Sequence, residues 1–550
     1  MRRVAWSSVC LLAALAAGCE APAERAQHEP AVPAVPAIDP AALEAHMRFL
    51  ADDSLEGRRT GTEGFALAAE YVAGQFDAIG LEPAGEEGFF QKVTLRRGLL
   101  DRDVSALTLS RDGHPLETSM LGDYYLSPRF LTEESTVTGS VVYAGFGITA
   151  PEFGHDDLAG VDLEGKIAAV FTGAPETFPH DERAYYSSSE QKMGGLVERG
   201  AIGVLLLLDE EDLARYPWDR RTAHARMPGM RWIDGEGMVR DAYPELRVVG
   251  VLHASMLEKL FAGAPRSVEQ ILESKKKGEP SSFDLGLEAT ARTVTRLSDV
   301  TSPNVAGRLA GGDPSLKAEN VVMTAHLDHV GTGEPIDGDG IYNGAYDNAS
   351  GIAVMIEAAR VLSSMDPGPR RSVIFLAVTG EEAGLLGAEH FVDDPTVPSG
   401  SIVADVNVDM VLMLHPLRDV IAFGAEHSSL AGPLEAAVGR LGIEVSPDPY
   451  PEEVVFIRSD QYAFVKKGIP SVFLVPGQST GDPAIDGGTM ERDWLRTVYH
   501  TPKDDMTQDF DLPAGAAFAR LSATLVRLVA DDPARPSWNE GDFFGGKFGD

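Results

Sequence analysis

The C-terminal half of this 550-residue chain contains a set of side chains that can bind divalent cations, each at or just after the end of an apolar run. The set offers two imidazoles, several aspartates and a pair of adjacent glutamates. Its members are His326 with Asp328, Asp347, Glu381 with Glu382, Asp409 and His500. Imidazole and carboxylate ligands without sulfur indicate zinc, with cobalt or manganese as alternatives. The set could hold two cations and leave one carboxylate to move a proton, which points to metal-assisted hydrolysis.

His326 and Asp328 are two residues apart, so in an extended segment their side chains point to the same side. Asp328 could then accept a hydrogen bond from one ring nitrogen of His326 while the other nitrogen faces a metal. Such an arrangement fixes the tautomer of the imidazole and raises its basicity. Alone, the spacing is a weak signal, because a His and an Asp at this separation often occur by chance.

Glu381 and Glu382 follow the apolar run 373–379 after a single residue, Gly380. Adjacent carboxylates at such a place repel each other and lose hydration, a cost that a nearby cation removes. Neighbouring side chains leave the backbone in different directions, so one glutamate can bind the cation while the other addresses a bound water. A solvated acidic turn is the alternative.

Asp347 stands where a helix is expected to begin, so it could simply cap that helix. Asn348 and Ser350 could serve as caps instead, which would leave Asp347 free. A carboxylate has two oxygens and can bridge two cations, whereas a single imidazole does not.

Strands and helices alternate from about residue 296 onward. This alternation predicts an open α/β sheet, and ligands of such sheets bind beyond the carboxyl ends of the strands. His326, the glutamate pair and Asp409 all fall at those ends. The expected strands are 320–325, 372–378, 402–408, 420–423 and 472–475, and the expected helices are 349–362, 385–392 and 513–529.

The rest of the chain divides into segments that differ in the spacing of their apolar residues. Helical spacing of apolar residues predicts two helices within 41–80, the second ending at Gly80. Short β-like runs and turns over 101–290 indicate a separate, mainly β module inserted between 41–100 and 291–530. Residues 531–550 show no periodicity, so a flexible tail is expected there.

The N-terminus indicates export. Two arginines precede the short apolar run 9–17, and small residues then lead to Cys19. This resembles a bacterial lipoprotein signal, 1–18, with Cys19 as the lipidated residue and the Pro/Ala-rich stretch 19–40 as a tether. An ordinary secreted protein is the alternative. We expect an exported, membrane-anchored lipoprotein, facing the periplasm or on the outer membrane.

Charge and cysteine content narrow the function further. The net charge of −37, from 47 basic and 84 acidic residues, disfavours nucleic acid as a partner. The acidic balance indicates a solvated, self-repelling surface or, alternatively, a field that attracts cationic substrates. The only cysteines are Cys10 and Cys19, so the mature domains have neither a disulfide nor a thiolate ligand.

Taken in order and context, the ligand motifs resemble those of the M28 family of zinc peptidases, its aminopeptidase group with a co-catalytic metal pair, over about 41–530. Within 101–290, segments 145–148 and 162–167 resemble the protease-associated (PA) domain that many relatives carry as an insertion. The resemblance implies a zinc-aminopeptidase fold of the phosphorylase/hydrolase-like type, a mostly parallel or mixed sheet flanked by helices.

The resemblance also implies roles. His326, Asp347 and Asp409 would hold one Zn²⁺, and Asp347, Glu382 and His500 the other, with Asp347 bridging. Glu381 would be the general base, and Asp328 would orient His326. The expected activity is that of an aminopeptidase acting on peptide or protein substrates.

Other readings stay open. A carboxypeptidase of the same fold would need arginines for the terminal carboxylate, for which Arg458 is a candidate, and a glutaminyl cyclase would use one metal. A non-enzymatic binding protein is the third alternative. His329 and His390 are expected to be loop or packing residues, and Gln461 is assigned no role.

Overall fold

The structure, a computed structural model, describes residues 33–549. The predicted signal segment, Cys19 and most of the tether lie outside the described residues. From Val35 onward the chain forms one unit. Within it we distinguish a main lobe, residues 35–100 and 291–549, from an inserted lobe, residues 101–290.

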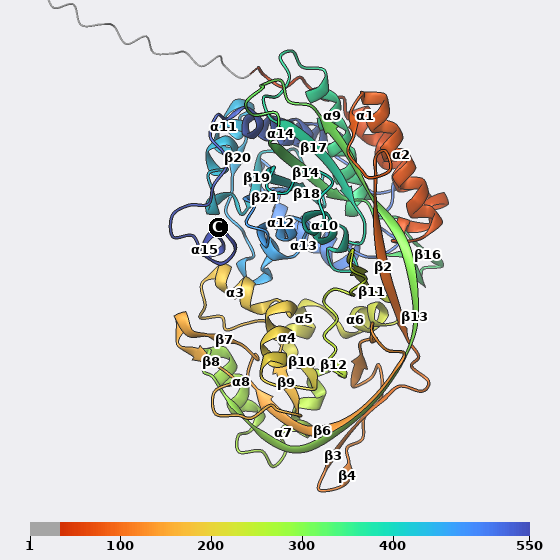
Figure 1. The fold of residues 1–550 in the computed structure, drawn as a ribbon, viewed down its shortest axis with the longest axis vertical. Coiled ribbons are helices and arrows are strands. Elements are labelled where there is room, and N and C mark those ends of the chain that lie inside the picture. The colour runs from red at the N-terminus through yellow and green to blue at the C-terminus, as the bar shows by residue number, and fades with distance from the viewer. Residues whose placement is uncertain (1–32, 550) are drawn as a thin grey trace, which may run out of the picture. The chain divides into compact units, whose positions relative to one another are not determined.

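A mixed sheet forms the centre of the main lobe (Figure 1). Its four middle strands are parallel and fully paired side by side. They lie in the order β17 (Ser372–Val378), β14 (Asn320–His326), β18 (Ile402–Val408) and β21 (Ser471–Pro476). Antiparallel strands flank them, β13 (Ser282–Leu309) beside β17 and β19 (Asp419–Phe423) beside β21. The α/β architecture expected from the alternating pattern is therefore confirmed.

Helices cover both faces of this sheet, which explains the continuous apolar sequences of the middle strands. On one face pack α1 (Pro40–Leu50), α2 (Glu63–Ile79), α9 (Ser350–Ser363) and α14 (Leu512–Asp531). On the other pack α10 (Leu386–Asp393) and α12 (Gln461–Val465). Within β17, Val373 and Phe375 join the first cluster and Ile374 and Leu376 the second, as the two-residue period of a strand requires.

The helix boundaries agree with the local signals. Thr62 caps α2 through a hydrogen bond from the backbone of Phe65, and Gly80 ends it in the left-handed conformation with φ 85°. Within the described residues, α14 alone is long and apolar enough to cross a membrane. However, 72% of its most apolar window is buried inside the protein, as expected of a core helix.

The inserted lobe has its own sheet and is more helical than its sequence indicated. Strands β6 (Glu134–Ala144), β9 (Ile167–Phe171), β10 (Gly203–Leu207) and β12 (Val248–Leu252) are parallel neighbours in that order. Six helices accompany them: α3 (His180–Ser187), α4 (Ser189–Glu198), α5 (Glu210–Arg215), α6 (Trp218–Ala225), α7 (Leu257–Phe261) and α8 (Val268–Lys277). The inserted lobe thus contains the β-strands that the sequence indicated together with short helices, of which only the stretch from about 188 to 198 was expected. The assignment to the PA domain stays a prediction.

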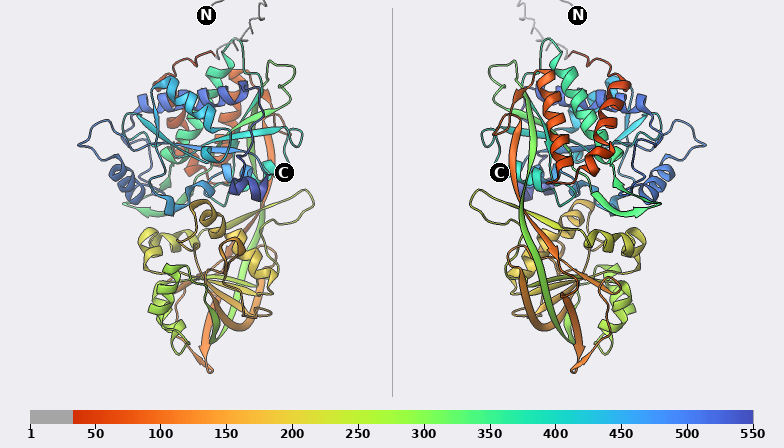
Figure 2. Two further views of the ribbon diagram at one scale, coloured as in Figure 1. Left: turned by 90° about the vertical axis from the view of Figure 1, so that its left-hand side faces the viewer. Right: turned by 90° about the vertical axis from the view of Figure 1, so that its right-hand side faces the viewer.

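The lobes are joined by strands rather than by linkers. Strand β13 runs through both sheets, so the predicted boundary at 290/291 falls inside it (Figures 1 and 2). Strand β11 (Gly229–Ile233) lies within the inserted region by sequence, yet it pairs with β2 (Phe90–Leu100) at the edge of the main sheet.

The C-terminal segment is ordered, which corrects the expectation of a flexible tail at 531–550. It ends in the short helix α15 (Phe543–Phe548), whose Phe544 is fully buried against Phe456. The indole N–H of Trp538 donates to the carbonyl of Gly468. Contacts of its aromatic side chains hold this segment against the main lobe. Because these aromatic residues are not regularly spaced, the sequence shows no helix or strand pattern there.

Candidate metal centre

The predicted site residues converge at the carboxyl ends of the parallel strands. His326 is the last residue of β14, Asp409 directly follows β18, and the glutamate pair follows β17 after a two-residue turn. Asp347 lies in the turn Ala345–Ala349 before α9. His500, with φ 53°, follows α13 (Gly487–Thr497). Residues 174 positions apart therefore meet at one edge of the sheet, where open α/β sheets bind their ligands.

His326, Asp347 and Asp409 form the first donor group. The Nε2 atom of His326 lies 2.9 Å from Oδ1 of Asp409 and 3.3 Å from Oδ1 of Asp347. All three side chains are buried. The hydroxyl of Ser459 donates to Oδ2 of Asp409 at 2.8 Å, and Asn407 donates to Ser459 at 2.9 Å. This chain of donors leaves the Oδ1 atom of Asp409 for the shared centre.

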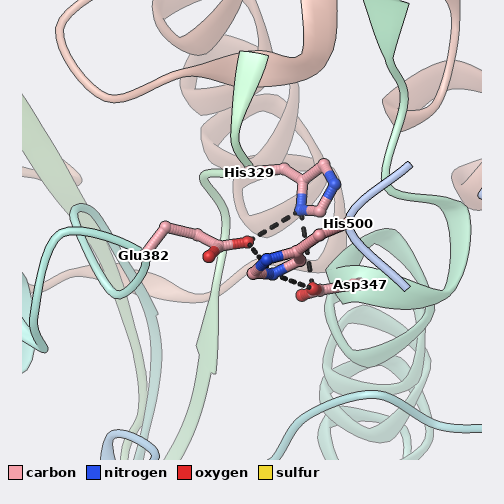
Figure 3. Close-up of side chains that lie close together, drawn as sticks. All are labelled: His329, Asp347, Glu382 and His500. Atoms are coloured by element: carbon pink, nitrogen blue, oxygen red, sulfur yellow. Dashed lines mark ion pairs between the residues drawn. The ribbon is translucent and has the colours of Figure 1, made fainter. Parts of the chain in front are cut away.

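Asp347, Glu382 and His500 form the second donor group, and the structure adds His329 to it (Figure 3). The Nε2 atom of His500 lies 3.2 Å from Oδ2 of Asp347 and 3.1 Å from Oε1 of Glu382. His329 Nδ1 lies 2.9 Å from the same Oε1. The structure thus brings His329, which was expected to be a loop or packing residue, among the predicted ligands. The available signal was a second imidazole on the same strand-end loop as His326.

Asp347 is free to serve both groups because other residues do the capping. The side chain of Asn348 accepts a hydrogen bond from the backbone of Gly351 at 2.9 Å, as a helix cap would. The backbone N–H groups of Tyr346 and Asp347 donate to the buried carboxylate of Asp504 at 2.8 and 3.0 Å. Each oxygen of Asp347 thus faces a different donor group, Oδ1 the first and Oδ2 the second.

Asp328 does not orient His326 through its carboxylate, contrary to the prediction. The Nδ1 atom of His326 contacts the backbone carbonyl of Asp328 at 3.0 Å instead. The carboxylate of Asp328 accepts hydrogen bonds from the hydroxyl of Thr60 at 3.0 Å and from the backbone N–H of Glu381 at 3.1 Å. The backbone N–H of Glu382 donates to the same carboxylate at 3.4 Å. The loop curls after β14, so the carboxylate faces the glutamate turn and not the imidazole.

Electrostatics separates the two glutamates. Burial raises the pKa of Glu381 well above its usual range, and the negative charges of Asp409, Asp460 and Glu382 outweigh the opposing effect of His326. For Glu382, burial also favours the neutral form, but His500 and His329 lower its pKa to about 2. Opposite shifts in neighbouring carboxylates indicate different roles, a proton carrier and an ionised ligand.

The remaining donors are held in charge-complementary states. Burial alone would raise the pKa of Asp347, but the imidazoles His329, His326 and His500 hold it well below its usual range. Burial opposes protonation of His326 and His500, yet the carboxylates around each raise its pKa well above normal. A divalent cation could replace those protons, because metal ligands must be deprotonated. The donor set of imidazole nitrogens and carboxylate oxygens fits zinc.

Comparisons with known proteins agree with this chemistry. Residues 304–526 match the sequence model of peptidase family M28. A "Probable zinc metalloprotease" of Pyrenophora tritici-repentis (strain Pt-1C-BFP) is 27% identical over 234 residues, 37% of this chain and 52% of that protein. A "Glutamate carboxypeptidase 2 homolog" of Caenorhabditis elegans is 27% identical over 316 residues, 50% of this chain and 38% of that protein.

A solved structure, "Aminopeptidase from Aneurinibacillus sp. strain AM-1", covers 91% of this chain and 98% of its own, with a TM-score of 0.51 and 18% identity. At that identity the likeness shows the fold alone. The matched region spans about half or less of the two curated relatives.

The donor set fits zinc, and the fold resembles that of the solved aminopeptidase. Residues 304–526, the part of the chain that matches the family M28 model, include every predicted ligand.

Proposed function

We propose that this protein is an aminopeptidase that hydrolyses N-terminal peptide bonds with two divalent cations, for which the donor set fits zinc. The observation that carries the proposal is the carboxylate of Glu381. It stands beside two donor groups that share Asp347, yet among the described residues it has neither a hydrogen-bond nor an ion-pair partner. A carboxylate left unpaired at such a site is suited to exchange protons with a substrate or a water.

A divalent cation bound here would polarise the scissile carbonyl and lower the pKa of a nucleophilic water from about 15.7 toward about 7. The chain's own groups would do the rest. Glu381 takes a proton from the attacking water and returns it to the departing amine, so the carboxylate is regenerated in each cycle. Burial and the neighbouring carboxylates raise the pKa of Glu381 above its usual range, which is the direction that makes a carboxylate a stronger base.

Tyr499 supplies a further polar group. Its ring stacks on the imidazole of His500, with centroids 3.9 Å apart. Burial and the charges of Asp347 and Glu382 raise the pKa of this phenol well above its usual range. Tyr499 therefore stays protonated and can donate a hydrogen bond to an oxygen that gains negative charge during attack.

The choice between aminopeptidase and carboxypeptidase depends on what would bind the substrate's terminus. Arg458, the candidate for a terminal carboxylate, lies 3.5 Å from both the carbonyl and the Oε2 atom of Glu453. That engagement disfavours the carboxypeptidase alternative. Two donor groups favour two cations, which disfavours a cyclase with one metal. The complete ligand set disfavours a binding protein without activity.

Glu381→Gln tests the proposal. We expect turnover of aminoacyl substrates to fall by at least about 1,000-fold while the metal content stays that of the wild type, because Glu381 carries protons and is not a ligand. Turnover and metal content would be measured on the same preparation, with chelator-treated wild type as the control. A variant that keeps its activity would refute the role of Glu381.

The position of cleavage is tested with a panel of free and N-blocked peptides, each with and without chelator. Blocking the amine should stop an aminopeptidase and leave an endopeptidase or a carboxypeptidase running. Activity that survives blocking would overturn the aminopeptidase proposal and favour the alternatives.

We also propose that the chain is exported and anchored through a lipid on Cys19, with the Pro/Ala-rich stretch as the tether. The support is the sequence pattern alone. Cys19→Ala should release the protein from the membrane fraction and abolish incorporation of labelled fatty acid. Unchanged membrane attachment would contradict the proposal.

A further inference from the structure

Four donor atoms of the second group surround one point (Figure 3). Four separate loops contribute one donor atom each: His329 Nδ1, Asp347 Oδ2, Glu382 Oε1 and His500 Nε2. The ligand atoms that these four residues offer all lie within 4.8 Å of one another. Besides the contacts already given, His329 Nδ1 lies 3.6 Å from Asp347 Oδ2. Two imidazoles and two carboxylates therefore share one small volume.

These close contacts are not well-formed hydrogen bonds. His329 Nδ1, Glu382 Oε1 and His500 Nε2 are all buried, and none has an aligned hydrogen-bond partner among the described residues. Buried polar atoms are normally satisfied. These donor and acceptor atoms are about 3 Å apart but are not aligned for hydrogen bonds with one another. They can instead point at a common centre, where a bound cation would interact with all of them.

The spacing fits tetrahedral coordination. Zinc binds nitrogen and oxygen at about 2.0–2.1 Å, so the ligand atoms of a regular tetrahedron are about 3.3 Å apart. The four contacts measured here are 2.9, 3.1, 3.2 and 3.6 Å, which lie on both sides of that value.

Local structure places His329 for this task. A side chain on Gly344 would come within 2.6 Å of the His329 ring, so the glycine makes room for the imidazole. The backbone N–H of His329 donates to the carbonyl of Arg58 at 3.3 Å. The ring is wholly buried and meets the ring of His500 edge-on, with centroids 5.6 Å apart.

We infer that His329 is a fourth protein ligand of the second cation, so the two cation sites are unequal. The second site would be closed by four protein ligands, whereas the first, with His326, Asp347 and Asp409, keeps a position for water or substrate. Closed tetrahedral sites are typical of tightly held zinc, and open ones of catalytic zinc. The inference rests on the proposed metal-dependent function, and it adds that the second site fills first and releases its ion last.

Stepwise loading of the metal-free full-length protein tests the order of binding. At one equivalent of Zn²⁺, X-ray absorption should report two imidazoles on the bound ion, those of His329 and His500. One equivalent of Co²⁺ should give the intense visible absorption of a tetrahedral ion. A single imidazole on the first ion would overturn the inference, and this result needs no variant.

His329→Leu provides the second arm. Changes that merely perturb a ligand's hydrogen-bond partner cost about 10–100-fold in metal affinity, so loss of a direct ligand should weaken the tighter site by at least about 100-fold. His390→Leu is the matched control. His390 is also buried, and neither of its ring nitrogens has a hydrogen-bond partner among the described residues, but it packs on Trp232 outside the donor groups. The control should keep both affinities.

A His329→Leu protein that binds both ions with wild-type affinity would overturn the inference. If that variant does not fold, the imidazole count on the wild-type protein still decides. Glu381→Gln separates this inference from the proposed function, because loss of the general-base role would leave the metal affinities and the imidazole count unchanged.

Discussion

Asp328 supports the site through contacts that differ from those expected from the sequence. Its carbonyl holds the ring of His326, and its carboxylate holds the backbone of Glu381. Thr60, from the N-terminal part of the chain, donates to the same carboxylate. Asp328 thus links the first donor group to the turn that contains Glu381.

Replacing Asp328 by Ala separates the two contacts. The variant keeps the carbonyl that contacts His326 but loses the acceptor for the glutamate turn. We expect kcat to fall by about 10–100-fold, as for other residues that support a site from outside, while the affinity of the first site for its cation is retained. Titration with zinc and steady-state kinetics would be the measurements. Loss of that affinity would restore the carboxylate–imidazole arrangement that the sequence predicted.

At the scale of elements, the short 3-10 segment Asp53–Arg58 fixes the loops that carry the ligands. The guanidinium of Arg58 is buried, and within residues 33–549 it donates only to backbone carbonyls. The acceptors are the carbonyls of Leu327 at 3.0 Å, Asn343 at 2.6 Å, Gly344 at 3.0 Å and Leu50. Arg58 thereby ties the loop after β14 to the turn that presents Asp347. Burial lowers its pKa to about 10, and nearby carboxylates, Asp347 first, oppose that shift.

Arg58→Met should therefore destabilise the main lobe. Each carbonyl left without a donor in a buried place costs about 1–3 kcal/mol, so we expect a loss of at least about 3 kcal/mol in the free energy of unfolding. Arg58→Lys should not restore it, because an ammonium lacks the planar fork. Arg48→Met is the control: Arg48 is exposed and pairs only with Glu44 on the same helix, a contact worth about 0.5 kcal/mol. Urea unfolding of the three variants would show whether Arg58 has this role.

At the scale of the whole unit, the C-terminal segment joins the main lobe to the inserted lobe. Tyr185 of α3 packs against Phe543 of α15, and Lys547 reaches Glu152 at 3.1 Å. His427 lies between the lobes, 2.7 Å from Asp542 of the C-terminal segment and 3.5 Å from Asp181 of α3. Burial alone would lower the pKa of His427, but Asp181 and Asp542 raise it to about 9.

This shift predicts a pH dependence. A pKa raised in the folded state gives stability that is complete below the unfolded value of about 6.5 and is lost as pH rises through about 9. A pKa raised from 6.5 to about 9 corresponds to at most about 3–4 kcal/mol. In urea unfolding, the free energy of unfolding of the wild type should therefore exceed that of His427→Gln by less at pH 10 than at pH 6. An advantage that is unchanged with pH would rule out the proposed ion pairs.

His390 provides the comparison for that experiment. Burial lowers its pKa, with Asp394 the largest opposing charge, so it gains no stability from protonation. His390→Gln should show no loss of a wild-type advantage as pH rises. A similar loss in both variants would mean that the effect is not specific to His427.

The sequence alone determined the strands, the long helices and most residues of the two donor groups. Those features depend on local spacing: continuous apolar runs for β14 and β17, a helical period for α9 and α14, and polar residues at strand ends. Two-residue and 3.6-residue periods are visible within a short window, whatever the rest of the chain does.

Only the tertiary structure decided which partner each side chain takes. Arg58 meets Leu327 across 269 positions, Thr60 meets Asp328 across 268, and His329 joins ligands that follow three other elements. The ordering of residues 531–549 likewise depends on aromatic contacts with distant strands and helices. Hydrogen-bond direction and burial arise from packing between remote segments, and no local period encodes them.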